Sequence, residues 1–122
     1  MKVVVLGASD NPARYSYMAM ISLLSHGFDA IPVGIKKTDI DHIPIIQSKK
    51  PLPGIHTITV YLNPIRQKEW YEFILKTNPQ RIIFNPGTEN LELIQLVLDK
   101  HIEVVEACTL VLLSTGQFAQ TI

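Results

Sequence analysis

The chain has few of the features that extracellular and membrane-bound proteins usually need. Cys108 is its only cysteine, which excludes an internal disulfide and fits a reducing compartment. It has no apolar run of about 18 residues, the length of a membrane-spanning helix. The apolar run at the amino terminus is also too short for the core of a signal peptide. We therefore expect a cytoplasmic protein that does not bind membranes.

An excess of one charge is also missing. Lysine plus arginine number 11 and aspartate plus glutamate number 11, so the formal net charge is zero. Such a chain has no overall field to attract nucleic acid or anionic lipid, so an anionic ligand would need local charge. With 122 residues, of which 47% are hydrophobic and 18% charged, the chain is expected to form one compact domain over residues 1–122.

Catalytic and metal-binding motifs are absent as well. The four histidines are scattered, with no pair at ligand spacing, so no metal site is expected. G-x-S-x-G, H-E-x-x-H, the P-loop and the dinucleotide fingerprint G-x-G-x-x-G do not occur. Cys108 remains as a candidate nucleophile, its alternative being a small buried hydrophobe. A binding module is therefore favoured over an enzyme.

The first twelve residues carry the strongest positive signal. The apolar run of residues 3–6 is bounded by small turn residues, which predicts a strand buried on both faces of a parallel sheet. Asn11 is expected to cap a helix whose first residue is Pro12. Free N–H groups of the turn and the helix dipole would then form a phosphate site, with Gly7 letting an anion approach. The Ser9 hydroxyl would donate to a phosphate oxygen, and Arg14, which lies in the first helical turn, would favour binding of the anion.

Strand and helix signals then alternate along the chain, which predicts a parallel sheet with helices on both faces. Further strands are expected at 28–33, 57–61, 81–84 and 103–105, with a short edge strand at 43–46. Helices are expected at 13–25, from Asn63 and Pro64 to 76, and from a Thr88 cap to 100. Residues 110–113 predict a helical turn or a strand. The expected fold is a single-domain, three-layer, Rossmann-like doubly wound α/β fold.

Ligands of such sheets bind beyond the carboxyl ends of the strands. Four segments meet this rim: residues 7–12, 34–37, 61–64 and 85–87. Lys36 and Lys37 stand where an NAD-binding protein would have an acid for the ribose. They suit a ribose phosphate instead, as in NADP or coenzyme A, and the alternative is an ordinary solvated pair.

Three segments together resemble a known family. They are Gly7-Ala8-Ser9-Asp10-Asn11-Pro12, Pro32-Val33-Gly34-Ile35-Lys36 and Asn85-Pro86-Gly87. In this order they resemble the small stand-alone CoA-binding proteins, which are similar to the CoA-binding domain of the succinyl-CoA synthetase α subunit. The resemblance implies a Rossmann-like domain that binds coenzyme A, generally without an assigned reaction. It also implies that residues 7–9 and Asn11 line the pyrophosphate turn and that Lys36 meets the 3′-phosphate. Residues 61–64 would flank the adenine or pantetheine path.

The sequence therefore predicts binding of coenzyme A or an acyl-CoA by a non-catalytic or regulatory module. The alternatives are an NADP-binding, oxidoreductase-like protein and an interaction scaffold without a ligand. The oligomeric state stays open, although a homo-oligomer would suit so small an α/β protein. The candidate ligand-binding residues are Gly7, Ala8, Ser9, Asn11, Pro12, Arg14, Gly34, Lys36, Tyr61, Asn63, Pro64, Asn85, Pro86 and Gly87.

Overall fold

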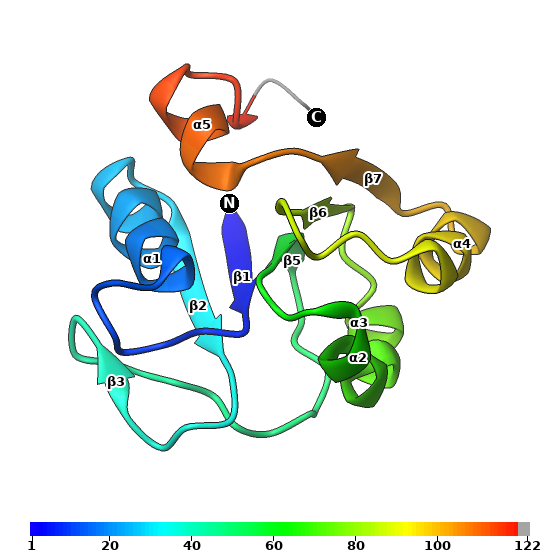
Figure 1. Cartoon of the computed structure of the whole chain (residues 1–122), viewed down its shortest axis with the longest axis horizontal. Helices are drawn as coiled ribbons and strands as arrows, with labels where there is room; N and C mark the ends of the chain where they lie inside the picture. The colour runs from blue at the N-terminus through cyan, green and yellow to red at the C-terminus, as the bar shows by residue number, and fades with distance from the viewer. Residues whose placement is uncertain (120–122) are drawn as a thin grey trace.

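A five-stranded parallel sheet forms the centre of the protein (Figure 1). The computed structural model describes residues 1–119. The strands follow the order β2-β1-β5-β6-β7, and every neighbouring pair is parallel. Their bounds are Lys2–Leu6 (β1), Asp29–Val33 (β2), Ile55–Val60 (β5), Arg81–Phe84 (β6) and Glu103–Glu106 (β7). The chain thus adds β2 on one side of β1 and then returns to its other side, where the direction of winding reverses.

Helices cover both faces of this sheet (Figure 1). One face carries α1 (Tyr15–Ser25) and α5 (Thr109–Ser114). The other carries α2 (Pro64–Gln67), the 3₁₀ turn η1 (Lys68–Trp70), α3 (Tyr71–Thr77) and α4 (Leu91–Asp99). The predicted Rossmann-like, three-layer fold is confirmed. In residues 1–119, no helix combines the length and the apolar character needed to cross a membrane.

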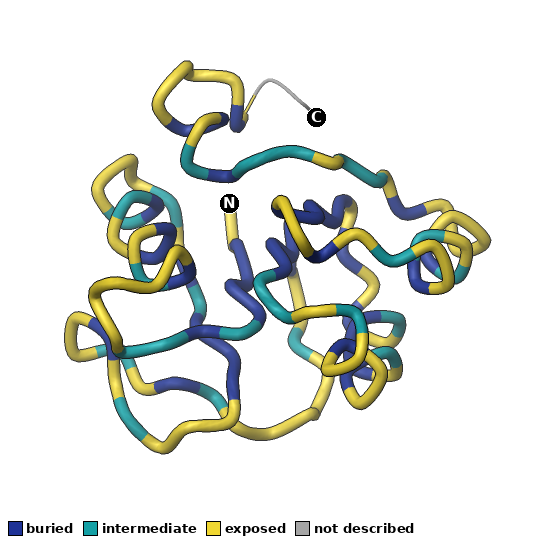
Figure 2. Tube along the Cα trace, in the orientation of Figure 1, coloured by how far each residue is buried: buried dark blue, intermediate teal, exposed yellow. Residues whose placement is uncertain are grey.

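The first strand is buried on both faces, as its sequence predicts. Val4 and Leu6 pack into the core beneath α3 and α4, whereas Val3 and Val5 pack beneath α1 and α5. All four side chains are fully buried. Figure 2 shows the same concentration of buried residues in the central strands. The alternating side chains of β1 enter two cores, so the strand is fixed from both faces of the sheet. The start of the loop that follows β1 is fixed with it.

The segment between β2 and β5 leaves the sheet and returns to it. It forms a small antiparallel hairpin of β3 (Asp39–Ile40) and β4 (Ile43–Pro44), which departs from the single edge strand predicted over 43–46. Ile46 then makes one parallel bridge to Val33. Pro32 lies inside β2. Its carbonyl accepts from Ile46 N–H, so its missing N–H belongs to the outer edge of the sheet and costs no bond to β1.

Two predicted helix starts have different outcomes. Asn63 caps α2 as expected, with Oδ1 accepting from Arg66 N–H at 2.9 Å. The single helix predicted to follow is divided into α2, η1 and α3. The predicted cap at Thr88 is wrong, because its hydroxyl donates to the Asn85 carbonyl and Asn90 caps α4. Residues 110–113 lie in helix α5.

Candidate functional site

The loops at the carboxyl ends of the strands enclose a cleft of about 740 Å³. This volume lies within the range of small-molecule sites. The cleft lies where the strand order reverses between β2-β1 and β5, the place at which open α/β sheets bind ligands. It is lined by Gly7, Ala8, Ser9, Ala13, Arg14, Tyr15, Ser16, Gly34, Ile35, Lys36, Tyr61, Leu62, Asn63, Arg66, Glu69, Trp70, Pro86 and Thr88.

The floor of the cleft depends on two glycines. Gly7 has a φ of +94°, and a Cβ there would lie 3.0 Å from the Leu62 side chain. At Gly34, a Cβ would lie 3.0 Å from the Ala8 carbonyl oxygen. The loops after β1, β2 and β5 therefore touch one another only because these positions lack side chains. The structure thus explains Gly7 by the close approach of Leu62.

The loop of residues 7–12, predicted to bind a phosphate, directs its first N–H groups elsewhere. Those of Gly7 and Ala8 both donate to the Val33 carbonyl, at 2.9 and 3.0 Å. These two groups join the first loop to the end of β2. The expectation that they are free to receive an anion is therefore wrong, and other groups of the cleft, such as the start of α1, have to provide the donors.

Helix α1 begins at Tyr15, later than the start predicted at Pro12 or Ala13. The Ser9 hydroxyl accepts from Asn11 N–H at 3.1 Å, and Asn11 Oδ1 accepts from Ala13 N–H at 3.0 Å. These local turns use Asn11 before the helix starts, so Asn11 is not its cap and Pro12 is not its first residue. The N-cap position belongs to Arg14, whose side chain makes no capping bond.

This shift has a consequence for anion binding. The first N–H groups of an α-helix have no intrahelical partner and carry the positive end of the helix dipole. Tyr15 and Ser16, at this end of α1, line the cleft together with Arg14. An uncapped helix end and a guanidinium group therefore border the same space, an arrangement that favours a phosphate group.

Lys36 reaches the first loop from the loop after β2. Its Nζ lies 3.0 Å from Asp10 Oδ1, while Asp10 Oδ2 accepts from the Thr38 hydroxyl at 3.1 Å. The hydrogen bond from Lys36 holds the pKa of the Asp10 carboxyl below its ordinary value. Lys36 lines the cleft, whereas Lys37 is exposed and does not. The structure thus separates two lysines that the sequence leaves equivalent.

The opposite wall is built by the loop after β5 and by α2. Tyr61, Leu62 and Asn63 line the cleft there, followed by Arg66 in the first turn of α2. The Tyr61 hydroxyl is buried and has no hydrogen-bond partner within residues 1–119. Burial raises the pKa of this phenol to about 12, so it stays protonated at neutral pH.

Five of the fourteen predicted residues lie outside the lining of the cleft. Asn85 is one of them: its amide donates to the Thr59 hydroxyl and the Val60 carbonyl, and Oδ1 accepts from Thr109 N–H. It therefore joins β5, β6 and α5, so its amide hydrogens are unavailable to a ligand. Gly87 donates its N–H to Glu89 Oε1. The five residues are Asn11, Pro12, Pro64, Asn85 and Gly87.

The remaining nine predicted residues meet around this one cleft. The model of the CoA binding domain family matches residues 1–114 of the chain. The chain belongs to the CoA binding domain family. Its resemblance to CoA-binding proteins, first drawn from three short segments, is thereby confirmed.

Solved structures share the fold of this chain. An uncharacterised protein has 45% sequence identity and a TM-score of 0.94, over 96% of this chain and 97% of its own. A hypothetical protein from Pyrococcus horikoshii OT3 has 25% identity and a TM-score of 0.80, over 88% of this chain and 77% of its own. A Thermus thermophilus protein has 19% identity and a TM-score of 0.84, over 96% and 90%. Among curated proteins, no relative matches the chain.

In this member of the CoA binding domain family, seven lining residues lie outside the segments to which the sequence pointed. They are Ala13, Tyr15, Ser16, Arg66, Glu69, Trp70 and Thr88. Arg66 carried a usable signal, because it lies three residues after the helix cap Asn63 and so belongs to the first turn of α2. The cleft holds three of the chain's 11 lysines and arginines and one of its 11 acids. A protein of zero net charge thus has a locally positive cleft, as an anionic ligand requires.

Proposed function

We propose that this protein binds coenzyme A or an acyl-CoA in the cleft between α1 and α2, as a binding module. The observation that carries the proposal is the uncapped start of α1 beside Arg14, at the switch point of a chain in the CoA binding domain family. Helix N–H groups and a guanidinium together provide the directed donors that a diphosphate needs. The carboxyl end of the sheet supplies them from a fixed backbone.

Each end of the ligand has its own group of residues in this proposal. Ser16 and Arg14 border the diphosphate, and Gly7, Ala8 and Gly34 form the floor beneath it. Lys36 meets the 3′-phosphate of the ribose. It lies on the β2 side of the cleft, where the ribose of a nucleotide bound to such a fold is read. Tyr61, Asn63 and Pro86 flank the pantetheine arm on the other side of β1.

The composition of the cleft favours binding over catalysis. Its lining includes neither histidine nor cysteine, the commonest bases and nucleophiles near neutral pH. The high pKa of Tyr61 makes that phenol a poor base. Cys108 is the N-cap residue of α5 and does not line the cleft. We therefore propose a protein that senses, stores or presents its ligand.

Two neighbouring lysines provide the test. We expect Lys36→Ala to reduce the affinity for CoA about tenfold and to leave the affinity for dephospho-CoA nearly unchanged, since a charge-assisted bond to the 3′-phosphate is lost. The matched control is Lys37→Ala, which removes an exposed charge outside the cleft. Isothermal titration calorimetry of the three proteins with CoA, dephospho-CoA, NADP and NAD gives both affinities and ligand choice.

The outcomes separate the functions that the sequence left open. The proposal is supported if the wild type binds CoA more tightly than dephospho-CoA and if Lys36→Ala, but not Lys37→Ala, removes this preference. Binding of NADP in place of CoA would favour an oxidoreductase-like protein. No heat with any nucleotide would favour an interaction scaffold and would overturn CoA binding.

A further inference from the structure

We propose that Arg66 is a second cationic arm of the site, which binds the diphosphate of the ligand from the wall opposite Arg14. This inference rests on the proposed function, because it takes the ligand to be a CoA-type nucleotide. It adds a residue on another element, since Arg14 precedes α1 and Arg66 belongs to α2. The two arginines line one cleft from its two sides.

The backbone that carries Arg66 is held firmly. Asn63 Oδ1 accepts from Arg66 N–H, which fixes the first turn of α2. The next residue, Gln67, is fully buried. Its amide donates to the carbonyls of Leu62 and Thr88, at 2.8 and 2.7 Å, and its Oε1 accepts from the amide of Asn90. So many buried bonds in a helix of four residues give Arg66 a rigid platform beside the cleft.

The charge of Arg66 is not neutralised by an acid. Within residues 1–119 the ion pairs join Lys36 to Asp10, Lys49 to Glu69 and Lys76 to Glu72. Arg66 takes part in none of them, although Glu69 lies three residues further along the chain and also lines the cleft. An exposed guanidinium that borders a cleft and has no ion-pair partner among these residues is available to an anion. Its planar donors match two phosphate oxygens at once.

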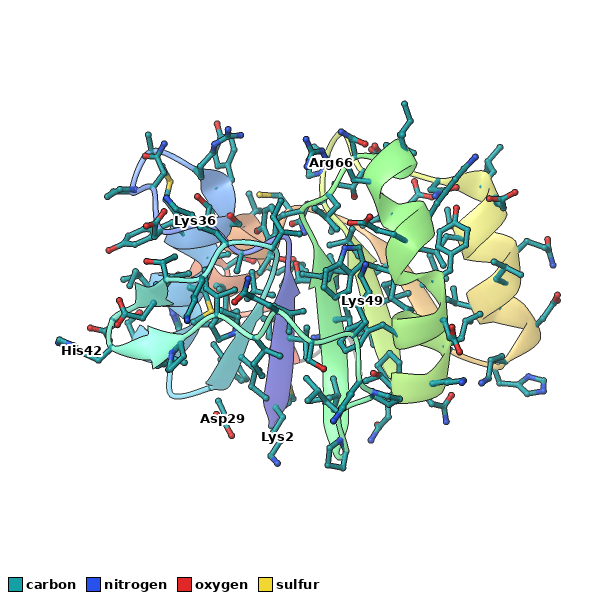
Figure 3. All side chains as sticks on the ribbon, turned by 90° about the horizontal axis from the view of Figure 1, so that it is seen from below. Lys2, Asp29, Lys36, His42, Lys49 and Arg66 are labelled. Atoms are coloured by element: carbon teal, nitrogen blue, oxygen red, sulfur yellow. The ribbon has the colours of Figure 1, made fainter. Side chains whose placement is uncertain are left out.

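The position of α2 brings Arg66 to the diphosphate in preference to the ribose phosphate. The loop before α2 packs directly against the loop after β1, because the Leu62 side chain lies only 3.0 Å from where a Cβ of Gly7 would be. Lys36, by contrast, comes from the loop after β2. Figure 3 shows Lys36 and Arg66 at the same end of the sheet on opposite sides of β1, with Lys2 at the other end. The diphosphate lies between these sides, at the end of β1, so Arg66 and Lys36 serve different phosphates.

The experiment compares three ligands on three variants. Isothermal titration calorimetry is run with CoA, dephospho-CoA and adenosine 3′,5′-bisphosphate, which lacks a diphosphate. We expect Arg66→Ala to weaken CoA and dephospho-CoA equally, by about tenfold, because both lose the same charge-assisted bonds. The bisphosphate should change much less. Arg66→Lys should restore part of the affinity, since the charge returns without the paired donors.

Lys68→Ala is the matched control, because Lys68 is exposed and lies two residues away but outside the cleft. It should bind all three ligands like the wild type. If the wild type binds CoA and Arg66→Ala binds it equally well, the role of Arg66 is overturned while the proposed function stands. A loss confined to ligands with a 3′-phosphate would also overturn it. If the wild type itself binds none of the three, the proposed function fails first.

Discussion

Single residues beside the cleft carry charges that compensate one another. The clearest case is Asp10, whose carboxylate accepts from Lys36 and from Thr38. Both partners come from the loop after β2, so Asp10 joins the two loops that meet at the proposed ribose phosphate. A phosphate that approaches Lys36 has to share this lysine with a carboxylate of the same sign. If the proposed site is correct, Asp10 should therefore lower the affinity for the 3′-phosphate while it positions the lysine.

Replacing this carboxylate by an amide gives a prediction at the scale of one residue. We expect Asp10→Asn to increase the affinity for CoA by up to about fivefold, the size of an exposed ion-pair effect. Dephospho-CoA, which lacks the 3′-phosphate, should bind as it does to the wild type. Competition between the two ligands, measured by calorimetry, checks the difference. Weaker CoA binding in this variant would show that Asp10 serves chiefly to hold Lys36 in place.

At the scale of elements, the short helix α2 builds one wall of the cleft. Tertiary hydrogen bonds stabilise this helix more than its own backbone hydrogen bonds do. Four residues form too few internal hydrogen bonds to stabilise a helix by themselves. The buried amide of Gln67 supplies the rest through the Leu62 and Thr88 carbonyls and the Asn90 side chain. The loop after β5, the turn after β6 and the cap of α4 are thereby joined in one network.

Removing this network should destabilise the protein and loosen the wall of the cleft. We expect Gln67→Met to lower the free energy of unfolding by about 2 kcal/mol, because it leaves buried carbonyls without a donor. The control is Gln95→Met on α4, where the amide is exposed and donates only to Asp99. Urea unfolding followed by circular dichroism measures both variants. Equal midpoints for the two would contradict the anchoring role of Gln67.

The whole molecule separates ligand binding from stability at the two ends of the sheet. The carboxyl end holds the cleft, whereas the amino end holds the buried side chain of Arg81. Arg81, at the start of β6, is fully buried, donates to the Thr57 hydroxyl and the Phe118 carbonyl, and stacks on the Phe118 ring at 4.6 Å. His56 Nδ1 lies 2.7 Å from the same Thr57 hydroxyl. Thr57 thus accepts from Arg81 and shares a second hydrogen bond with His56, whose donor depends on the His56 tautomer.

This arrangement predicts how stability depends on pH. Burial, and then the charge of Arg81, lower the pKa of His56 in the folded protein. Below about pH 6.5, the ordinary value, the unfolded chain therefore binds a proton that the folded chain does not. As the pH decreases from that point, the free energy of unfolding should therefore decrease, until the pH reaches the lowered pKa of His56 in the folded state.

Urea midpoints between pH 7.5 and 5 measure this effect for the wild type and for His56→Asn. The variant should lose less stability over that interval, since its side chain does not titrate. His101→Asn, at an exposed position, serves as the control and should keep the slope of the wild type. Parallel curves for wild type and His56→Asn would exclude His56 as the source.

The sequence by itself determined the parts of this protein that depend on near neighbours in the chain. The apolar run of β1 specifies a strand buried on both faces, and Asn63 with Pro64 specifies the start of α2. Alternating strand and helix patterns specify the layers, because each pattern reports only which face of its own element must be buried. Where two local signals compete, sequence reading fails: Ser9 and Asn11 bond within their own loop, and α1 therefore begins at Tyr15.

Only the tertiary structure decided which residues meet. Asn85 and Pro86 are adjacent in the chain, yet the Asn85 side chain is buried and hydrogen-bonds a neighbouring strand, whereas Pro86 lines the cleft. Lys36 and Lys37 are also adjacent, yet only Lys36 lines the cleft. Arg14 and Arg66 are brought to one cleft by the order of β2, β1 and β5, which no local pattern encodes. Such contacts depend on how strands far apart in the sequence pair, and the free energy of that pairing comes from the two shared cores.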